Sequence, residues 1–190
     1  YGKLAVGDLL NKYDRILYLD TDILIRDDAP DLFKIVPIEK LGAFNEARFT
    51  ARQSSFVSYL VSAGVGPSQW NSKYYNTGVL MVSARHKELF SAPAEETNHF
   101  FEQSHLNAEI YKARAEVFQL DYKFNRMSCC DVPTGEQRHD AYFIHYAGVS
   151  GSIGETATLE LIKKDVEILE GAWRPYLFQK HLAVIVQGGM

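Results

Sequence analysis

The pattern of apolar and polar positions divides the chain into short apolar runs and longer segments that have one apolar face. Five apolar runs predict strands, over residues 15–20, 40–45, 77–83, 115–120 and 141–148. The first of these, RILYLD, is apolar almost throughout, which is typical of a strand covered on both faces. The chain therefore carries several core strands rather than a surface sheet.

Amphipathic segments predict helices between these runs. We expect a short helix from about 4 to 13 and a mixed helix and loop segment over 46–66, and a helical pattern over 89–114 is interrupted at Pro93. A further helix is expected after residue 28, capped by Asp27 or Asp28 with Pro30 in its first turn. The last helix, over about 156–172, has one apolar face, formed by Leu159, Ile162, Val166 and Leu169.

The alternation of strands and helices predicts an α/β fold with a mostly parallel sheet flanked by helices. Nothing in the sequence indicates an internal boundary, so residues 1–190 are predicted to form a single domain. Ligands of such sheets bind beyond the carboxyl ends of the strands. Asp20, at the end of RILYLD, lies at such an end.

Composition excludes some classes of partner. The chain has 190 residues, 46% of them hydrophobic, and a formal net charge of −4 without a long basic run, so we expect no nucleic-acid partner. No apolar stretch approaches the roughly 20 residues of a membrane span, and no signal-peptide pattern is present. The only cysteines, Cys129 and Cys130, are adjacent and predict no disulfide framework. We predict a cytoplasmic location, with a peripheral position at the membrane as a second option.

Two carboxylates, Asp20 and Asp22, stand between two apolar blocks in RILYLDTDILI. In an extended segment, residues two apart point to the same side, and two close carboxylates repel unless a cation or proton is shared between them. Mg²⁺ or Mn²⁺ would satisfy them with oxygen ligands, while a capping Asp and a turn Asp at a strand end are the structural alternative.

Two classes of enzyme use an apolar strand that ends in this D-x-D pattern. Phosphatase-like hydrolases with an aspartyl nucleophile usually have Thr or Val two residues beyond the second Asp, where this chain has Leu24. Nucleotide-sugar transferases use the pattern to hold Mn²⁺ on a diphosphate. A module that binds a sugar nucleotide or glycan without turnover is a third option.

Three further segments follow in order, YYNTGVLMVS (74–83), FEQSHLNAEIY (101–111) and FIHYAG (143–148). Together with the D-x-D segment they resemble glycosyltransferase family 8, retaining enzymes related to glycogenin and to bacterial lipopolysaccharide galactosyl- and glucosyltransferases. The resemblance covers most of residues 1–148. It implies a GT-A (Rossmann-like) fold and transfer of a hexose from a UDP-sugar to a glycan, lipid-linked sugar or protein acceptor.

The resemblance also implies a metal site and a catalytic face. Asp20, Asp22 and His145 match the metal ligands, with Mn²⁺ as the cofactor and Mg²⁺ as the alternative. Gln103 matches a residue near the anomeric carbon, and Glu102 stands where the family has an aspartate beside it.

Other positions are implied to contact the donor. These are Asn76, which matches an asparagine against the donor sugar, together with Gly78, Glu46, Lys3, Asp20 and Gly148. Each has a structural alternative as a turn, cap or solvated residue.

Two departures from the family pattern stand out. The family has a lysine shortly after its H-x-x-G segment, whereas this chain has Gly151 near that place, in a glycine-rich stretch whose amides are expected to bind phosphate. The family also begins with strands that bind uracil and ribose. The chain opens at Tyr1 without them, so we interpret it as an N-terminally incomplete piece of a longer protein.

Overall fold

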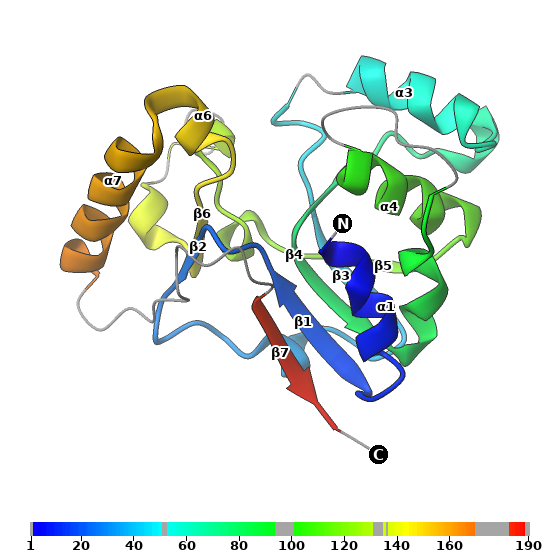
Figure 1. Ribbon diagram of the computed structural model, residues 1–190, viewed down its shortest axis with the longest axis horizontal. Helices are drawn as coiled ribbons and strands as arrows, with labels where there is room; N and C mark the ends of the chain where they lie inside the picture. The colour runs from blue at the N-terminus through cyan, green and yellow to red at the C-terminus, as the bar shows by residue number, and fades with distance from the viewer. Residues whose placement is uncertain are drawn as a thin grey trace.

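The structure, a computed structural model of the chain, describes residues 2–50, 53–93, 101–130, 135, 137–169 and 183–188. Its centre is a five-stranded sheet with helices packed around it (Figure 1). The strand order is β5-β3-β4-β1-β7, and the strands are β1 (Arg15–Leu19), β3 (Leu41–Asn45), β4 (Tyr75–Ser83), β5 (Val117–Gln119) and β7 (Ala183–Gln187). The predicted α/β class is confirmed, and four of the five apolar runs form β1, β3, β4 and β5 of this sheet, while the run over 141–148 forms β6 (Phe143–His145) of a second sheet and β7 was not predicted.

The prediction that the sheet is mostly parallel is wrong for the described strands. β4 runs antiparallel to both β1 and β3, β7 runs antiparallel to β1, and only β3 and β5 are parallel. All nine residues of β4 are buried. Burial on both faces requires only that both faces are covered, so an apolar run does not determine strand direction.

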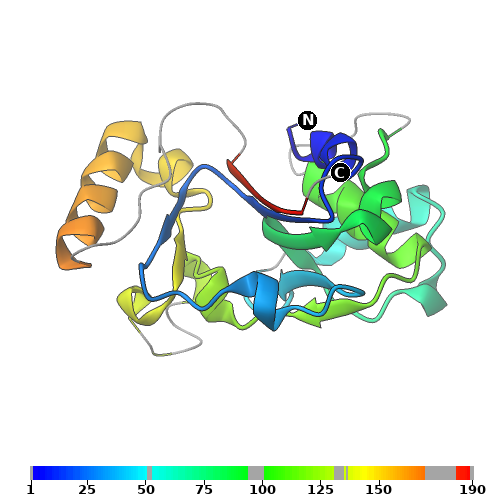
Figure 2. The same ribbon diagram turned by 90° about the horizontal axis from the view of Figure 1, so that it is seen from below.

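The second apolar block of RILYLDTDILI belongs to a separate two-stranded sheet. β2 (Ile23–Ile25) pairs antiparallel with β6 (Phe143–His145), so that Ile23 lies opposite His145. Figure 2 shows this pair turned away from the large sheet, beside α6 (Val149–Ile153) and α7 (Glu155–Ile168). The chain therefore passes from one sheet to the other between Leu19 and Ile23, where the two aspartates stand.

The core has two main parts, one on each face of the large sheet. In β1, Ile16 and Tyr18 pack with α1 (Val6–Leu9) and α4 (Phe101–Lys112), while Leu17 and Leu19 pack with α2 (Leu32–Ile35) on the other face. This period of two explains why every residue of β1 is buried. Burying one Leu or Ile side chain contributes about 2 kcal/mol, so both faces stabilise the strand.

The predicted helices are present with different boundaries. The short helix expected from about 4 to 13 is η1 (Lys3–Ala5) followed by α1. The expected cap of α2 is wrong, because the side chain of Asp31, and neither Asp27 nor Asp28, accepts the hydrogen bond from Phe33 N. Asp31 directly precedes the helix, where its carboxylate reaches an unpaired backbone N–H.

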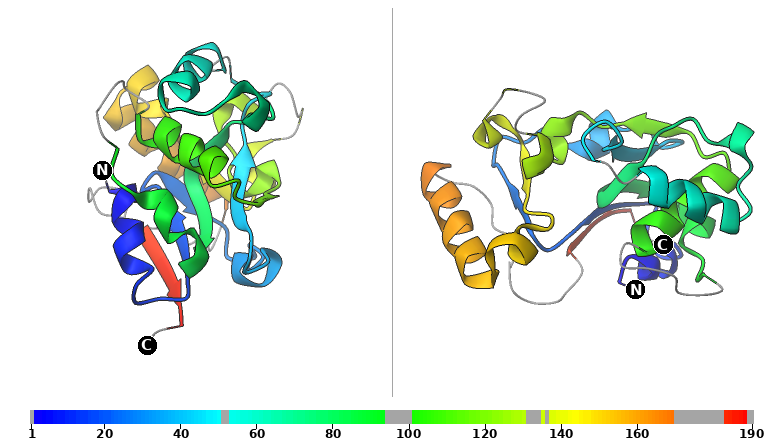
Figure 3. Two further views of the ribbon diagram at one scale, coloured as in Figure 1. Left: turned by 90° about the vertical axis from the view of Figure 1, so that its right-hand side faces the viewer. Right: turned by 90° about the horizontal axis from the view of Figure 1, so that it is seen from above.

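The remaining helices lie at the two ends of the molecule. Figure 3 shows α7 at one end and α3 (Gln53–Ser62) with α4 at the other. Part of the helical pattern over 89–114 falls on residues 94–100, which lie outside the described residues.

Five short 3-10 helices, η2 to η6, span Pro67–Gln69, Ala84–Phe90, Tyr122–Phe124, Ser128–Cys130 and Arg138–Asp140. None of the helices in the described ranges combines the length and hydrophobicity needed to span a bilayer.

Candidate metal and donor-sugar site

Asp20 and Asp22 flank a tight turn between the two sheets. Asp20 N donates to Gly78 O of β4 at 2.7 Å, and Asp22 O accepts from Tyr146 N, just past β6, at 2.9 Å. Residues 21 and 22 form a turn rather than extended strand, so the same-side argument from strand periodicity does not apply. The turn nevertheless brings the two carboxylates together, because each end of it is fixed to a different sheet.

Asp20, Asp22 and His145 converge on one point, with one ligand atom from each lying within 4.8 Å of the others. His145 Nε2 lies 3.2 Å from Asp22 Oδ1 and 3.7 Å from Asp20 Oδ2. The side chains of Asp20 and Asp22 are 26% and 43% exposed, whereas that of His145 is 2% exposed. Two carboxylates and an imidazole suit Mn²⁺, and the spacing matches ligands of a single ion, so the residues fit the implied metal.

The side chain of His145 affects the protonation of Asp22. Burial raises the pKa of Asp22, but the hydrogen bond and charge of His145 outweigh this and hold that pKa below its usual range. The Asp22 carboxylate thus stays ionised beside the imidazole and close to the side chain of Asp20, an arrangement that favours a cation.

The ring of His145 is held from behind by Asn125. Its Nδ1 lies 2.7 Å from Asn125 Oδ1, and both side chains are buried. A metal-binding histidine ordinarily donates its other N–H to such an acceptor, which orients the ring. His145 Nε2 accordingly faces the two carboxylates.

Asp20 is also contacted by a lysine and a tyrosine. Lys3 Nζ lies 3.0 Å from Asp20 Oδ1 and donates to Thr77 Oγ1 at 3.2 Å. Tyr18 OH donates to Asp20 Oδ1 at 2.7 Å. Burial and the Asp20 carboxylate raise the pKa of Tyr18, so its phenol remains a donor. The ammonium group of Lys3 therefore lies beside Asp20, and its contact with a donor stays a prediction.

A second group of side chains lies beside the metal ligands. Glu46, fully buried, accepts from Asn76 Nδ2 at 2.9 Å and from Gln103 Nε2 at 3.0 Å. Gln103 Oε1 accepts from Thr77 N at 3.1 Å. Glu46 directly follows β3, while Asn76 lies in β4 and Gln103 in α4, so the sheet and the helix together fix the positions of these residues.

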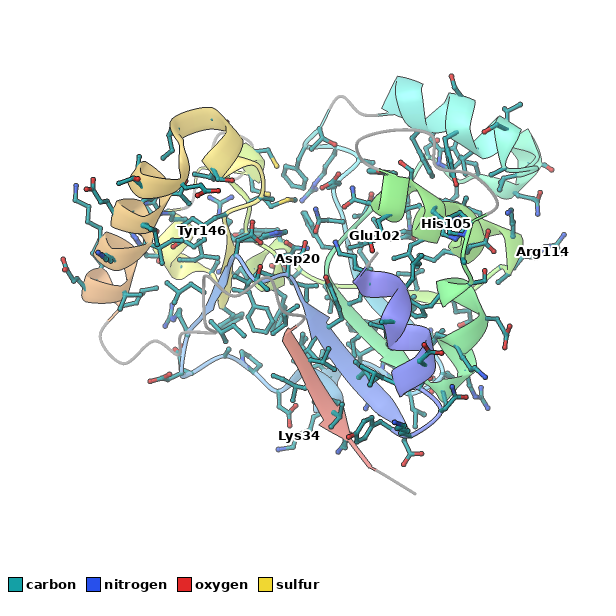
Figure 4. All side chains as sticks on the ribbon, viewed as in Figure 1. Asp20, Lys34, Glu102, His105, Arg114 and Tyr146 are labelled. Carbon is teal, nitrogen blue, oxygen red and sulfur yellow. The ribbon has the colours of Figure 1, made fainter. Side chains whose placement is uncertain are left out.

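Glu102 lies at the start of α4 and contacts the N-terminal segment. Its Oε1 accepts from the backbone N of Lys3 at 3.1 Å. Figure 4 shows Asp20 in the middle of the molecule, with Glu102 to one side on α4 and Tyr146 to the other. Glu102 thus helps to place Lys3, whose Nζ reaches Asp20.

The glycines predicted to contact the donor differ in their surroundings. A Cβ added to Gly78 would lie 2.3 Å from His145 Cε1 and 2.9 Å from Asp20 Oδ2, so the site leaves no room for a side chain there. Gly148 has φ +73° and precedes α6, with open space around it. Residues Val149–Ile153, which include Gly151, form the short helix α6 rather than the expected loop, and phosphate binding by their amides stays a prediction.

Two contacts were not predicted from the sequence. Asn125 stands in DYKFNRM, which matches none of the segments above, and it reaches His145 only because Arg126 and Ile144 form a parallel bridge. Tyr18 carried a usable signal. It lies in β1, two residues before Asp20, and side chains two residues apart in an extended segment point to the same side, so this contact could have been predicted.

The pattern that defines glycosyl transferase family 8 matches residues 1–150, which is most of the chain. The chain therefore belongs to glycosyl transferase family 8, and its membership indicates a glycosyltransferase that uses a sugar-nucleotide donor and an acceptor. No curated protein matches the sequence. The family assignment decides against the phosphatase-like alternative.

Proposed function

We propose that this chain carries the metal and donor-sugar part of a retaining hexosyltransferase that uses a UDP-sugar and Mn²⁺. The observation that carries the proposal is the convergence of Asp20, Asp22 and His145 on one point. These residues would hold the ion, with Mg²⁺ as the alternative. When bound, the ion would act as a Lewis acid that takes up negative charge on the leaving diphosphate.

The neighbouring side chains support a sugar at this place. Asn76 and Gln103 both donate hydrogen bonds to Glu46, so each of the three side chains has a fixed orientation before a substrate arrives. Fixed polar groups stabilise developing charge without reorganising, which is the largest catalytic contribution in many enzymes. Gln103, with Glu102 beside it, is our candidate for the face where the acceptor hydroxyl attacks the anomeric carbon.

Lys3 is the positively charged side chain of the proposed donor site. Its Nζ lies 3.0 Å from Asp20 Oδ1 in a partly buried position. A lysine there is suited to attract and orient a diphosphate, because a point charge with three donors binds phosphate oxygens. We assign Lys3 as the basic group beside the leaving diphosphate, because Gly151 stands near the place of the family lysine.

The donor sugar and the acceptor class follow from the family resemblance. A lipopolysaccharide or other glycan is the acceptor class we propose. A cytoplasmic location stays a prediction made from the sequence, whose two cysteines are adjacent and predict no disulfide framework.

The test is UDP release from a panel of UDP-sugars by the purified chain, with Mn²⁺ and with a chelator. Water can replace the acceptor, so slow donor hydrolysis is enough. We expect release that needs the metal, that disappears in D22N and that persists in D28N, which removes an exposed carboxylate paired with Arg26. Donor binding without release would instead support a sugar-nucleotide binding module, and equal release with the chelator would exclude the metal role.

A further inference from the structure

Five side chains form one hydrogen-bonded chain that runs from the candidate metal site to the candidate catalytic face. It starts at His145 Nδ1 and continues to Asn125 at 2.7 Å, Asn76 at 2.9 Å, Glu46 at 2.9 Å and Gln103 at 3.0 Å. The first four are buried. Water is therefore excluded as a substitute partner along most of the chain.

The orientation of Asn76, and through it that of Asn125, is set by a backbone group. Gly78 N donates to Asn76 Oδ1 at 2.8 Å, and a backbone N–H can only donate. Asn76 must therefore present its oxygen on that side, and Asn125 must offer its amide NH₂ to the same oxygen. The carboxylate of Glu46, an acceptor, receives the NH₂ of Asn76 and fixes its orientation from the other side.

The orientation of Asn125 then decides the proton on His145. With its NH₂ turned to Asn76, Asn125 presents Oδ1 to His145 Nδ1. A bond of 2.7 Å between these atoms requires hydrogen on Nδ1, since two lone pairs would otherwise face each other. The lone pair of neutral His145 is left on Nε2, the atom that faces Asp20 and Asp22.

We propose that Asn125 is a positioning residue that holds His145 in the Nδ1–H tautomer and so keeps Nε2 available to a metal ion. This inference rests on the proposed function, in which His145 is a ligand. Without Asn125, hydrogen on Nε2 would be favoured, because Nε2 could then donate to Asp22 Oδ1, 3.2 Å away. That tautomer cannot bind a metal through Nε2.

The backbone around Asn125 serves the same placement. Arg126 N donates to Phe143 O and His145 N donates to Arg126 O, each at 2.9 Å. These two bonds fix Asn125 beside the ring of His145 although the two residues are 20 positions apart. Asn125 is 0% exposed, so its amide has no solvent-facing alternative orientation.

The experiment compares three variants of the full chain. Asn125→Leu removes both amide groups at similar volume, whereas Asn125→Asp keeps an acceptor for His145. Asn107→Leu is the matched control, because Asn107 is equally buried and bonds Tyr75 N and O at 2.7 and 2.8 Å without touching His145. The ¹⁵N shifts of the His145 ring, measured without metal in alkaline buffer, report the tautomer, and calorimetry gives the Mn²⁺ affinity.

We expect wild type, Asn125→Asp and Asn107→Leu to carry hydrogen on Nδ1, and Asn125→Leu to carry it on Nε2 in a large fraction of molecules. Mn²⁺ affinity should fall about 10- to 100-fold in Asn125→Leu and stay closer to wild type in Asn125→Asp. A wild-type protein with hydrogen on Nε2 would overturn the inference, even if the leucine variant fails to fold. An Asn125→Leu protein with unchanged tautomer and affinity would do the same.

The metal site itself is judged by a different result. If wild type shows no Mn²⁺ binding, the proposed metal site is wrong. The tautomers of wild type and Asn125→Leu still decide whether Asn125 sets the state of His145.

Discussion

Within the described residues, two places put a carboxylate against a histidine, and their surroundings differ. At the candidate metal site, Asp20 and Asp22 face His145, and both aspartates are partly exposed. Beside α7, the fully buried Asp165 lies 2.7 Å from His139 Nε2.

The two places differ in the number of carboxylates that face the basic side chains and in the exposure of those carboxylates. Asp165 Oδ1 accepts from Arg138 Nη2 at 2.8 Å and faces His139, while its Oδ2 accepts from Tyr146 OH at 2.7 Å. Both oxygens are occupied, so the cluster binds α7 to the adjoining η6 and β6. At the candidate metal site, two partly exposed carboxylates face one lysine, Lys3, and one imidazole, and this arrangement leaves room for a cation. Both places combine aspartate, histidine and a basic residue. The number of carboxylates for each basic side chain, together with the exposure of the carboxylates, distinguishes a candidate ligand site from a structural contact.

The largest effect should follow from removing a carboxylate at the metal site. D22N should lower Mn²⁺-dependent UDP release by about 100-fold or more, since a lost Lewis acid costs several kcal/mol of transition-state stabilisation. Its free energy of unfolding should change by less than about 1 kcal/mol, because the Asp22 side chain is 43% exposed. Urea unfolding beside the release assay checks both. Full activity in D22N would make Asp22 a turn residue.

At the buried cluster of Asp165 with Arg138, His139 and Tyr146, here called the structural cluster, we expect a large change in stability. D165N should lower the free energy of unfolding by about 3 kcal/mol, because it leaves Arg138 without its buried counter-charge. D28N, which breaks an exposed pair with Arg26, should change it by less than about 0.5 kcal/mol. Chemical denaturation of the three proteins measures this. If D165N and D28N were equally stable, the buried cluster would not anchor α7.

A smaller effect is expected from filling the space at Gly78. The G78A side chain would meet His145 and Asp20, so overpacking should cost about 1–3 kcal/mol of stability and weaken Mn²⁺ binding. Gly151 is the control, since a Cβ there would meet nothing within 4 Å. G151A should keep both properties. Thermal unfolding and Mn²⁺ titration of the two variants test the contrast, which would disappear if G78A bound Mn²⁺ as wild type does.

The smallest effect should be the response of the structural cluster to acid. Burial raises the pKa of Asp165, but hydrogen bonds from Arg138, His139 and Tyr146 hold that pKa below its usual range. Because the folded pKa is depressed, this stabilisation is present above the ordinary value of about 3.9 and is lost as pH falls through the folded pKa. The stability difference between wild type and D165N should thus be constant above about pH 5 and shrink below about pH 4. If the stability difference between wild type and D165N grew as the pH fell, the direction given for the pKa shift of Asp165 would be wrong.

The local elements and the class of enzyme could be predicted from the sequence alone. Apolar runs placed β1, β3, β4 and β6, because burial patterns repeat over a few residues and need no knowledge of partners. The motif segments selected Asp20, Asp22 and His145 although the histidine is more than a hundred residues away. The roles of these and the other site residues remain predictions.

Only the tertiary structure decided how the pieces meet. It set the antiparallel neighbours of β4 and moved Ile23–Ile25 into a second sheet, and both depend on long-range pairing that a local pattern does not encode. It also brought Asn125 to His145, a contact of two polar side chains that leaves no periodic trace in the sequence. Hydrophobic burial is a property of segments and can be predicted from them. A hydrogen-bonded network needs particular atoms within about 3 Å, and only the folded backbone brings them there.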